Sequence, residues 1–243
     1  MIKEPQLDDT VNKAAYWSAI TLFVMVVPSI FLPLDAPEGP FTDRMMWFSS
    51  NLGAFILGWI VQMVAMLTLT AVFAATAWQV RGSHPLSAII AGIAVLISLV
   101  AFIIPKFIAI WSIPQMVGAS TSLSANVEVA EQLFQLLNPS LSFSLFTSFD
   151  YLGFWMYGVF GLVVAPALFR LSLSAKIAAI ALGLFGVLFH LLFIAVLTGN
   201  IVSADVGIVF ESIGALLLVS VGGMAVFLRK AIKAANSEEF ASR

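Results

Sequence analysis

The chain has 243 residues, of which 61% are hydrophobic and only 10% are charged, and its formal net charge is −2. Soluble domains carry roughly 25% charged residues, so this composition and a mean hydropathy of +1.05 exclude an ordinary soluble globule and indicate a helical membrane protein. The absence of cysteine excludes disulfides and thiolate metal centres, and the small negative charge argues against nucleic acid as a partner.

Six apolar runs predict an all-α fold, a polytopic membrane helix bundle with six transmembrane helices in one integral membrane domain, residues 1–243. Each run has about 20 residues or more, the length that crosses roughly 30 Å of hydrocarbon. The N-terminal segment is too acidic for a signal peptide, so the first run is expected to remain as a helix, kinked at Pro28. The expected spans are residues 14–32, 47–78, 86–113, 141–169, 175–197 and 206–228.

Lysine and arginine are distributed unevenly between the two sides of this bundle. If both termini are cytoplasmic, nine of the 11 lie inside, and only Arg44 and Lys106 lie toward the other side. Cytoplasmic loops carry such an excess, so both termini are predicted to be cytoplasmic, with the protein in a bacterial inner membrane. The nine residues are Lys3, Lys13, Arg81, Arg170, Lys176, Arg229, Lys230, Lys233 and Arg243.

The longest segment outside the membrane, Gln115–Ser140, contains a predicted short amphipathic helix over Asn126–Leu137, in the outer loop between spans three and four. Asn126 is a suitable N-cap, and Asn138-Pro139 a suitable stop. Such a helix is expected to lie on the membrane surface or to cover the bundle. Its apolar face is predicted as Ala130, Leu133, Phe134 and Leu137, opposite Glu128, Glu131, Gln132 and Gln135.

Small residues on the last three spans predict close helix packing, because lipid gives no hydrophobic drive for association and small side chains let backbones approach. They are Gly153, Gly158, Gly161, Ala175, Ala179, Gly183, Gly214, Gly222 and Gly223.

The segment Asn138–Arg170 carries an acid, Asp150, between long apolar stretches. A lone carboxylate near the bilayer centre costs roughly 2.5–3.5 kcal/mol on insertion scales, so Asp150 is expected to face protein or water and not lipid. Counting residues from the span ends places Lys106, His190 and Glu211 at a similar depth in the outer half of the bundle.

Two interpretations of these residues remain open. In the first, an outward-facing polar cavity binds a ligand through Asp150, Glu211, His190, Lys106, Asn51 and Tyr151. In the second, Lys106 reaches the interface, Glu211 is solvated, Asp150 forms one buried salt bridge and His190 forms one interhelical hydrogen bond.

Other chemistries find little support in the sequence. The two histidines are far apart with no metal-ligand spacing, so no metal site is expected and haem lacks a paired axial histidine. There is no phosphate-binding or dinucleotide motif and no G-x-S-x-G. Catalytic residues are not assigned, and the identity of any cofactor is unknown.

The segment Phe149–Leu192 resembles an uncharacterised family of bacterial six-span membrane proteins, known only as a domain of unknown function. In that family an acid, an aromatic residue and a glycine open a glycine-rich helix, which ends in a basic residue before the next helix. Phe149 stands where the family tends to have histidine, and Ala175-Lys176 where it has Pro-Arg. The resemblance implies the six-span fold and no activity. The matching residues are Asp150, Tyr151, Gly153, Gly158, Phe160, Gly161, Arg170, Lys176, Gly183 and Gly186.

Three functions are compatible with these features. The first is binding or transport of a small molecule, ion or lipid in the outward-facing cavity. The second is a non-enzymatic accessory subunit that docks another membrane protein through its glycine faces and the Asn126–Leu137 helix. The third is an intramembrane enzyme acting on a lipid or quinone, which needs Asp150 and His190 at a shared substrate position.

Overall fold

The computed structural model describes residues 4–120, 127–141, 143–202 and 205–241, and within these ranges the chain is all-helical. Six of the helices are long and apolar enough to cross a membrane, which confirms the six-span, all-α prediction and indicates an integral membrane protein. The proposed N-cap, Asn126, lies outside the described residues. The helices are α1 (Glu4–Ser29), α2 (Phe41–Val80), α3 (Pro85–Ser120), α4 (Val127–Leu137), α5 (Leu145–Leu168), α6 (Leu173–Leu197) and α7 (Val206–Ala241).

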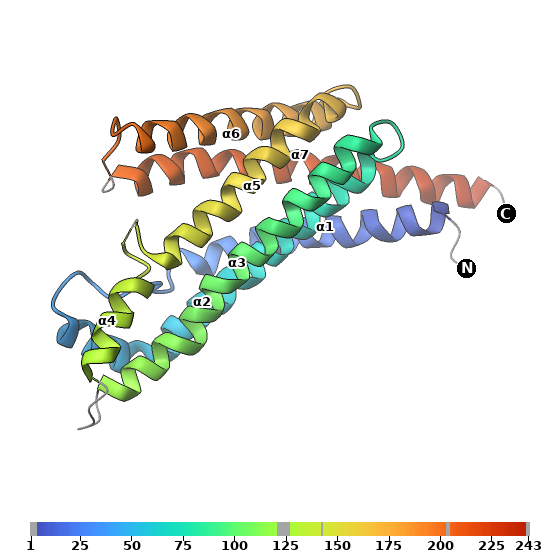
Figure 1. The fold of residues 1–243 in the computed structure, drawn as a ribbon. Coiled ribbons are helices and arrows are strands. Elements are labelled where there is room, and N and C mark those ends of the chain that lie inside the picture. The colour runs from blue at the N-terminus through green and yellow to red at the C-terminus, as the bar shows by residue number, and fades with distance from the viewer. Residues whose placement is uncertain (1–3, 121–126, 142, 203–204, 242–243) are drawn as a thin grey trace.

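The spanning helices form a ring in chain order. Each one packs mainly on its neighbours in the sequence, and α7 returns to pack on α1. Both chain ends lie at one end of the ring, together with the α2–α3 and α5–α6 turns, and we call this the terminal end (Figure 1). The opposite end, which carries α4, is the α4 end. Termini on one side agree with an even number of crossings, and the cytoplasmic location of that side stays a prediction.

Helices α2 and α3 are much longer than a bilayer requires. Their 40 and 36 residues correspond to about 60 and 54 Å at 1.5 Å per residue, against roughly 30 Å of hydrocarbon. Figure 1 shows them diverging from α6 and α7 toward the α4 end. The predicted third span ends at residue 113, but α3 continues through Pro105 and Pro114 to Ser120, because neighbouring helices tolerate proline inside a membrane helix.

The extra length supports a second hydrophobic core, separate from the core of the ring. The ring core includes Phe73, Tyr157, Phe160 and Phe185. The second core joins the start of α2, the end of α3, α4 and the start of α5, and we call this assembly the cap. Its buried side chains are Ala36, Met45, Phe48, Phe55, Trp59, Ala109, Ile113, Met116, Val117, Ala130, Phe134 and Phe146.

The buried face of α4 differs in part from the predicted one. Ala130 and Phe134 are buried in the cap and Leu137 packs against it, as expected. Leu133, however, is 45% exposed, and it shares an exposed stripe with Val129 and Leu136. The helix is therefore apolar on two sides, and hydrophobic spacing alone does not decide which stripe meets the protein.

A buried arginine joins three segments of the cap. The Nη2 group of Arg44 donates to both carboxylate oxygens of Asp35 at 2.7 Å, and to Oδ1 of Asn138 at 3.1 Å. The Arg44 side chain also lies over the ring of Phe134, 4.9 Å from its centroid. Burial raises the pKa of Asp35 above its ordinary value of 3.8, and the charge and hydrogen bond of Arg44 offset part of that rise.

Replacing Arg44 with methionine is expected to destabilise the cap more at neutral pH than at acidic pH. In the variant, burial still disfavours the Asp35 carboxylate, but the cation that compensates it is gone. The pKa of Asp35 in the folded state therefore rises further. Below about pH 4 the carboxyl is protonated in both the folded and unfolded states and the penalty vanishes. As the pH rises, Asp35 of the variant ionises freely only in the unfolded state. The free energy of unfolding of the variant therefore falls.

Unfolding of Arg44→Met and wild type in detergent at pH 4.5 and pH 7.5 measures this difference. Asp43→Asn is the matched control, because Asp43 is an exposed acid beside Arg44. An Arg44→Met deficit that is larger at pH 4.5 would contradict the assignment of a buried Asp35–Arg44 pair.

Candidate functional site

The first turns of α5 position two of the predicted site residues, Asp150 and Tyr151. Ser144 caps the helix, since its side-chain oxygen accepts a hydrogen bond from the Thr147 N–H at 3.2 Å. Asp150 and Tyr151 follow in the second turn, about 100° apart around the helix axis. Asp150 pairs with α3, whereas the Tyr151 ring packs on Phe210 of α7 with centroids 5.8 Å apart. Helix α5 therefore separates two different environments.

On one side of α5, Asp150 forms a largely buried ion pair with Lys106. Lys106 Nζ donates to Asp150 Oδ1, and the two side chains are 5% and 21% exposed. The same Nζ lies 5.2 Å from the ring centroid of Phe102 and 5.8 Å from that of Trp59. Phe102 belongs to the ring core and Trp59 to the cap core, so the pair marks the junction of the two cores.

On the other side of α5, His190 joins α5 to α6. Its Nε2 accepts a hydrogen bond from the Trp155 indole N–H at 3.0 Å, and its Nδ1 lies 2.6 Å from the Gly186 carbonyl oxygen. An indole N–H can only donate and a carbonyl can only accept. The two contacts together assign a neutral imidazole with its proton on Nδ1. His190 thus makes the interhelical hydrogen bond considered in the second interpretation.

The remaining predicted ligands do not join Asp150. Glu211 is exposed on α7, and Asn51 donates to the Trp47 carbonyl oxygen of its own helix at 2.9 Å. The structure therefore brings together Lys106 and Asp150, and gives His190, Glu211 and Asn51 other surroundings. Counting residues places these groups at similar depths, but depth does not specify the direction in which each side chain points.

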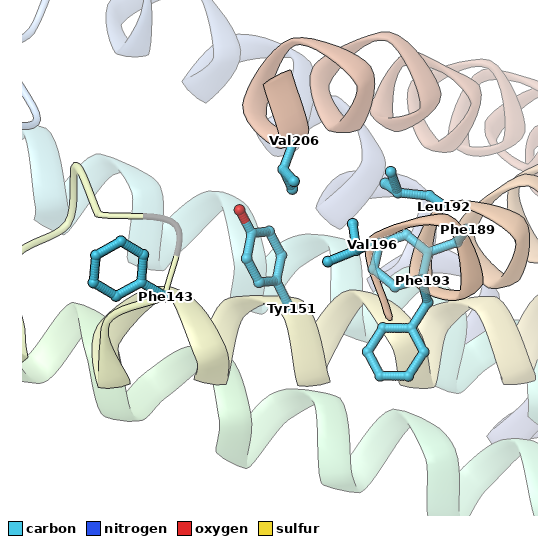
Figure 2. A pocket seen from close by; sticks show the side chains of 7 residues that line it. All are labelled: Phe143, Tyr151, Phe189, Leu192, Phe193, Val196 and Val206. Carbon is cyan, nitrogen blue, oxygen red and sulfur yellow. The ribbon is translucent and has the colours of Figure 1, made fainter. Parts of the chain in front are cut away.

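A cavity of about 170 Å³ lies between the start of α5, the end of α6 and the start of α7. Figure 2 shows the Tyr151 ring beside Phe143, with its hydroxyl on the side of Val206. Tyr151 is the one predicted site residue that lines this cavity. The lining is otherwise apolar, whereas the sequence analysis predicts a polar cavity. The full lining is Phe143, Tyr151, Phe189, Leu192, Phe193, Val196 and Val206.

Sequence reasoning missed six of these seven residues, because apolar side chains that line a cavity look the same in sequence as those that face lipid. The i, i+4 spacing of Phe189 and Phe193 shows only that they share one side of α6. Nothing in hydropathy distinguishes that side from the rest of the helix.

The chemistry open to this site is limited by its side chains. The described residues contain no group of three or more His, Asp or Glu residues that could hold a metal ion. Asp150 and His190 have different partners on opposite sides of α5, an arrangement that does not favour a shared acid–base site. An apolar cavity of about 150 Å³ in another protein stays dry and binds benzene, so this cavity suits an apolar group of similar size.

No protein-family model, curated protein sequence or solved structure matches the chain, and the resemblance to an uncharacterised six-span family stays a prediction.

Proposed function

We propose that the protein binds a membrane lipid or a related amphiphile, with part of an apolar chain in the cavity between α5, α6 and α7. The observation that carries this proposal is the cavity itself, about 170 Å³ in volume and lined by aromatic and aliphatic side chains. An acyl chain that moved from lipid into this cavity would stay in apolar surroundings, so its affinity would come from packing against the lining side chains.

Polar groups near the cavity favour an amphiphile over a pure hydrocarbon. The Tyr151 hydroxyl belongs to the lining. Beyond Val196, the α6–α7 connection carries exposed Thr198 and Asn200, joined by a hydrogen bond of 2.8 Å from Asn200 Nδ2 to Thr198 Oγ1. A bound headgroup would meet these groups at the α4 end, where the helices leave the hydrocarbon.

Filling the cavity is expected to reduce lipid binding several-fold. Val196→Phe adds bulk to a side chain that lines the cavity and is 37% exposed, so the larger ring can enter the space without rebuilding the core. The probe is a phosphatidylcholine with a photoactivatable diazirine near the end of one acyl chain, in phosphatidylcholine vesicles. Mass spectrometry of the crosslinked protein is expected to locate the label on residues of the cavity lining.

Leu191→Phe is the matched control, because Leu191 is 56% exposed on α6 and does not line the cavity. Its labelling pattern is expected to equal that of wild type. Labelling spread evenly over the apolar surface, or unchanged in Val196→Phe, would overturn the proposal. Recovery of a stoichiometric membrane-protein partner, with no labelling of the cavity, would favour the accessory-subunit alternative.

A further inference from the structure

We propose that the terminal end carries a binding surface for anionic phospholipid headgroups, formed by the α5–α6 turn and the adjoining part of α7. Its cationic side chains, which we call the basic rim, are Arg170, Lys176, Arg229, Lys230 and Lys233, and all five are exposed. This surface lies at the opposite end of the bundle from the cavity, so the two proposals are independent.

The two segments of the basic rim are brought together by close packing of α6 on α7. A Cβ added to Gly223 would lie 2.8 Å from the Ser174 carbonyl oxygen and 3.0 Å from the Ala178 nitrogen, so the two backbones touch at this level. Arg170 precedes Ser174 by four residues, and Arg229 follows Gly223 by six. Because α6 and α7 are antiparallel, Arg170 and Arg229 both lie on the terminal side of this contact.

The α7 cations share one side of their helix. Arg229 and Lys233 are four residues apart, Lys230 and Lys233 are three apart, and residues at these spacings are neighbours on a helix surface. Packing does not hide this side, since all three residues are exposed. The three charges therefore face solvent or headgroups together.

Among the side chains that the structure describes between residues 7 and 237, none forms an ion pair with the basic rim. None of its five cations takes part in the ion pairs of the described residues. Two acids of α1 at the terminal end have other partners: Asp8 pairs with Arg81 at 2.8 Å, and Asp9 with Lys13 at 2.6 Å. Neighbouring cations that take part in no ion pair repel one another, and a bound anion relieves that repulsion.

The apolar neighbours of the basic rim place it at the membrane surface. Phe169, Leu171 and Leu173 surround the α5–α6 turn and are 49%, 49% and 74% exposed. The Lys176 ammonium lies 5.4 Å from the ring centroid of Phe169. Exposed apolar side chains interleaved with cations suit the boundary where acyl chains meet phosphates, so the partner is a lipid headgroup and not a soluble anion.

The test is native mass spectrometry of the detergent-solubilised full chain, titrated with dioleoyl-phosphatidylglycerol or dioleoyl-phosphatidylcholine. Wild type is expected to bind the anionic lipid at least five-fold more tightly than the zwitterionic one. The triple variant Arg229→Ser/Lys230→Ser/Lys233→Ser is expected to lose most of that preference. The separate double variant Arg170→Ser/Lys176→Ser tests the other half of the surface.

Lys13→Ser is the control, because it removes a cation at the same end that is already paired with Asp9, and it is expected to keep the preference. Monodisperse elution and wild-type thermal unfolding establish that each variant is folded. Equal binding of the two lipids by wild type, or an undiminished preference in both multiple variants, would overturn the proposal. Full displacement of phosphatidylglycerol by millimolar inorganic phosphate would also overturn it, since it would reveal a simple anion site.

Discussion

Replacing Lys106 with methionine lowers the free energy of unfolding by about 3–5 kcal/mol, the usual result of removing one member of a buried ion pair. The variant removes the only cation that the described residues pair with Asp150, so the carboxylate, 21% exposed, loses the charge that compensates its lost hydration. Unfolding by increasing sodium dodecyl sulfate in mixed micelles measures the change. Lys176→Met is the matched control, because Lys176 is exposed and surface substitutions usually change stability by less than about 0.5 kcal/mol.

The double variant Lys106→Met/Asp150→Leu is expected to recover most of this loss, because apolar residues of similar volume can replace a buried ion pair at little cost. The same protein separates the two interpretations of Asp150. Unchanged crosslinking to the diazirine lipid would make the pair a structural connection between the two cores. Loss of crosslinking in a stable double variant would show that the Lys106–Asp150 pair contributes to ligand binding. A single variant as stable as wild type would show that Asp150 is hydrated by other means.

The second large effect is expected on the α5–α6 contact. Gly161→Ala lowers the free energy of unfolding by about 1–3 kcal/mol, the range for an added group in a packed core. An added Cβ would lie 2.5 Å from the Leu182 carbonyl oxygen and 3.1 Å from its carbonyl carbon. These are backbone atoms of a helix and cannot move aside individually, so α5 and α6 must separate.

Gly158→Ala is the matched control for this contact, one helical turn away on α5. Its added Cβ would lie 3.5 Å from His190 Cε1 and 3.6 Å from the Gly186 Cα, which are ordinary contacts. Because alanine also restricts the unfolded chain, Gly158→Ala is expected to be neutral or slightly stabilising. The same unfolding assay applies to both variants. Equal losses for the two would show that the helices are not held as closely as the structure describes.

The sequence predicted how deep each polar residue lies in the membrane, but not the direction in which its side chain points. Hydrophobic length identified six spans, and the cost of an isolated acid in lipid required a partner for Asp150, which is Lys106. Whether His190 faces Asp150 or Trp155 depends on the rotation of α6 about its axis. That rotation follows from side-chain packing in three dimensions, which hydropathy does not encode.

Two further features could not be read from the chain for related physical reasons. The cavity is bounded by Phe189, Leu192 and Val196, and such residues are equally suited to lipid contact and to a cavity wall. Helix α4 carries apolar residues on two sides, so hydrophobic spacing groups Leu133 with Ala130 and Phe134, although of these three only Ala130 and Phe134 are buried. In both cases the surroundings of a residue depend on segments distant in sequence.

The hydrogen bond from Arg44 to Asn138 can form only late in synthesis of the chain. These residues are 94 positions apart, and at roughly 5–20 residues per second the ribosome needs about 5 to 20 s to synthesise the chain between them. During that interval Arg44 can meet Asp35 but not its amide partner. Helix α3 ends at Ser120, only 18 residues before Asn138, so the completed α2–α3 hairpin lacks this contact for about 1 to 4 s of that interval.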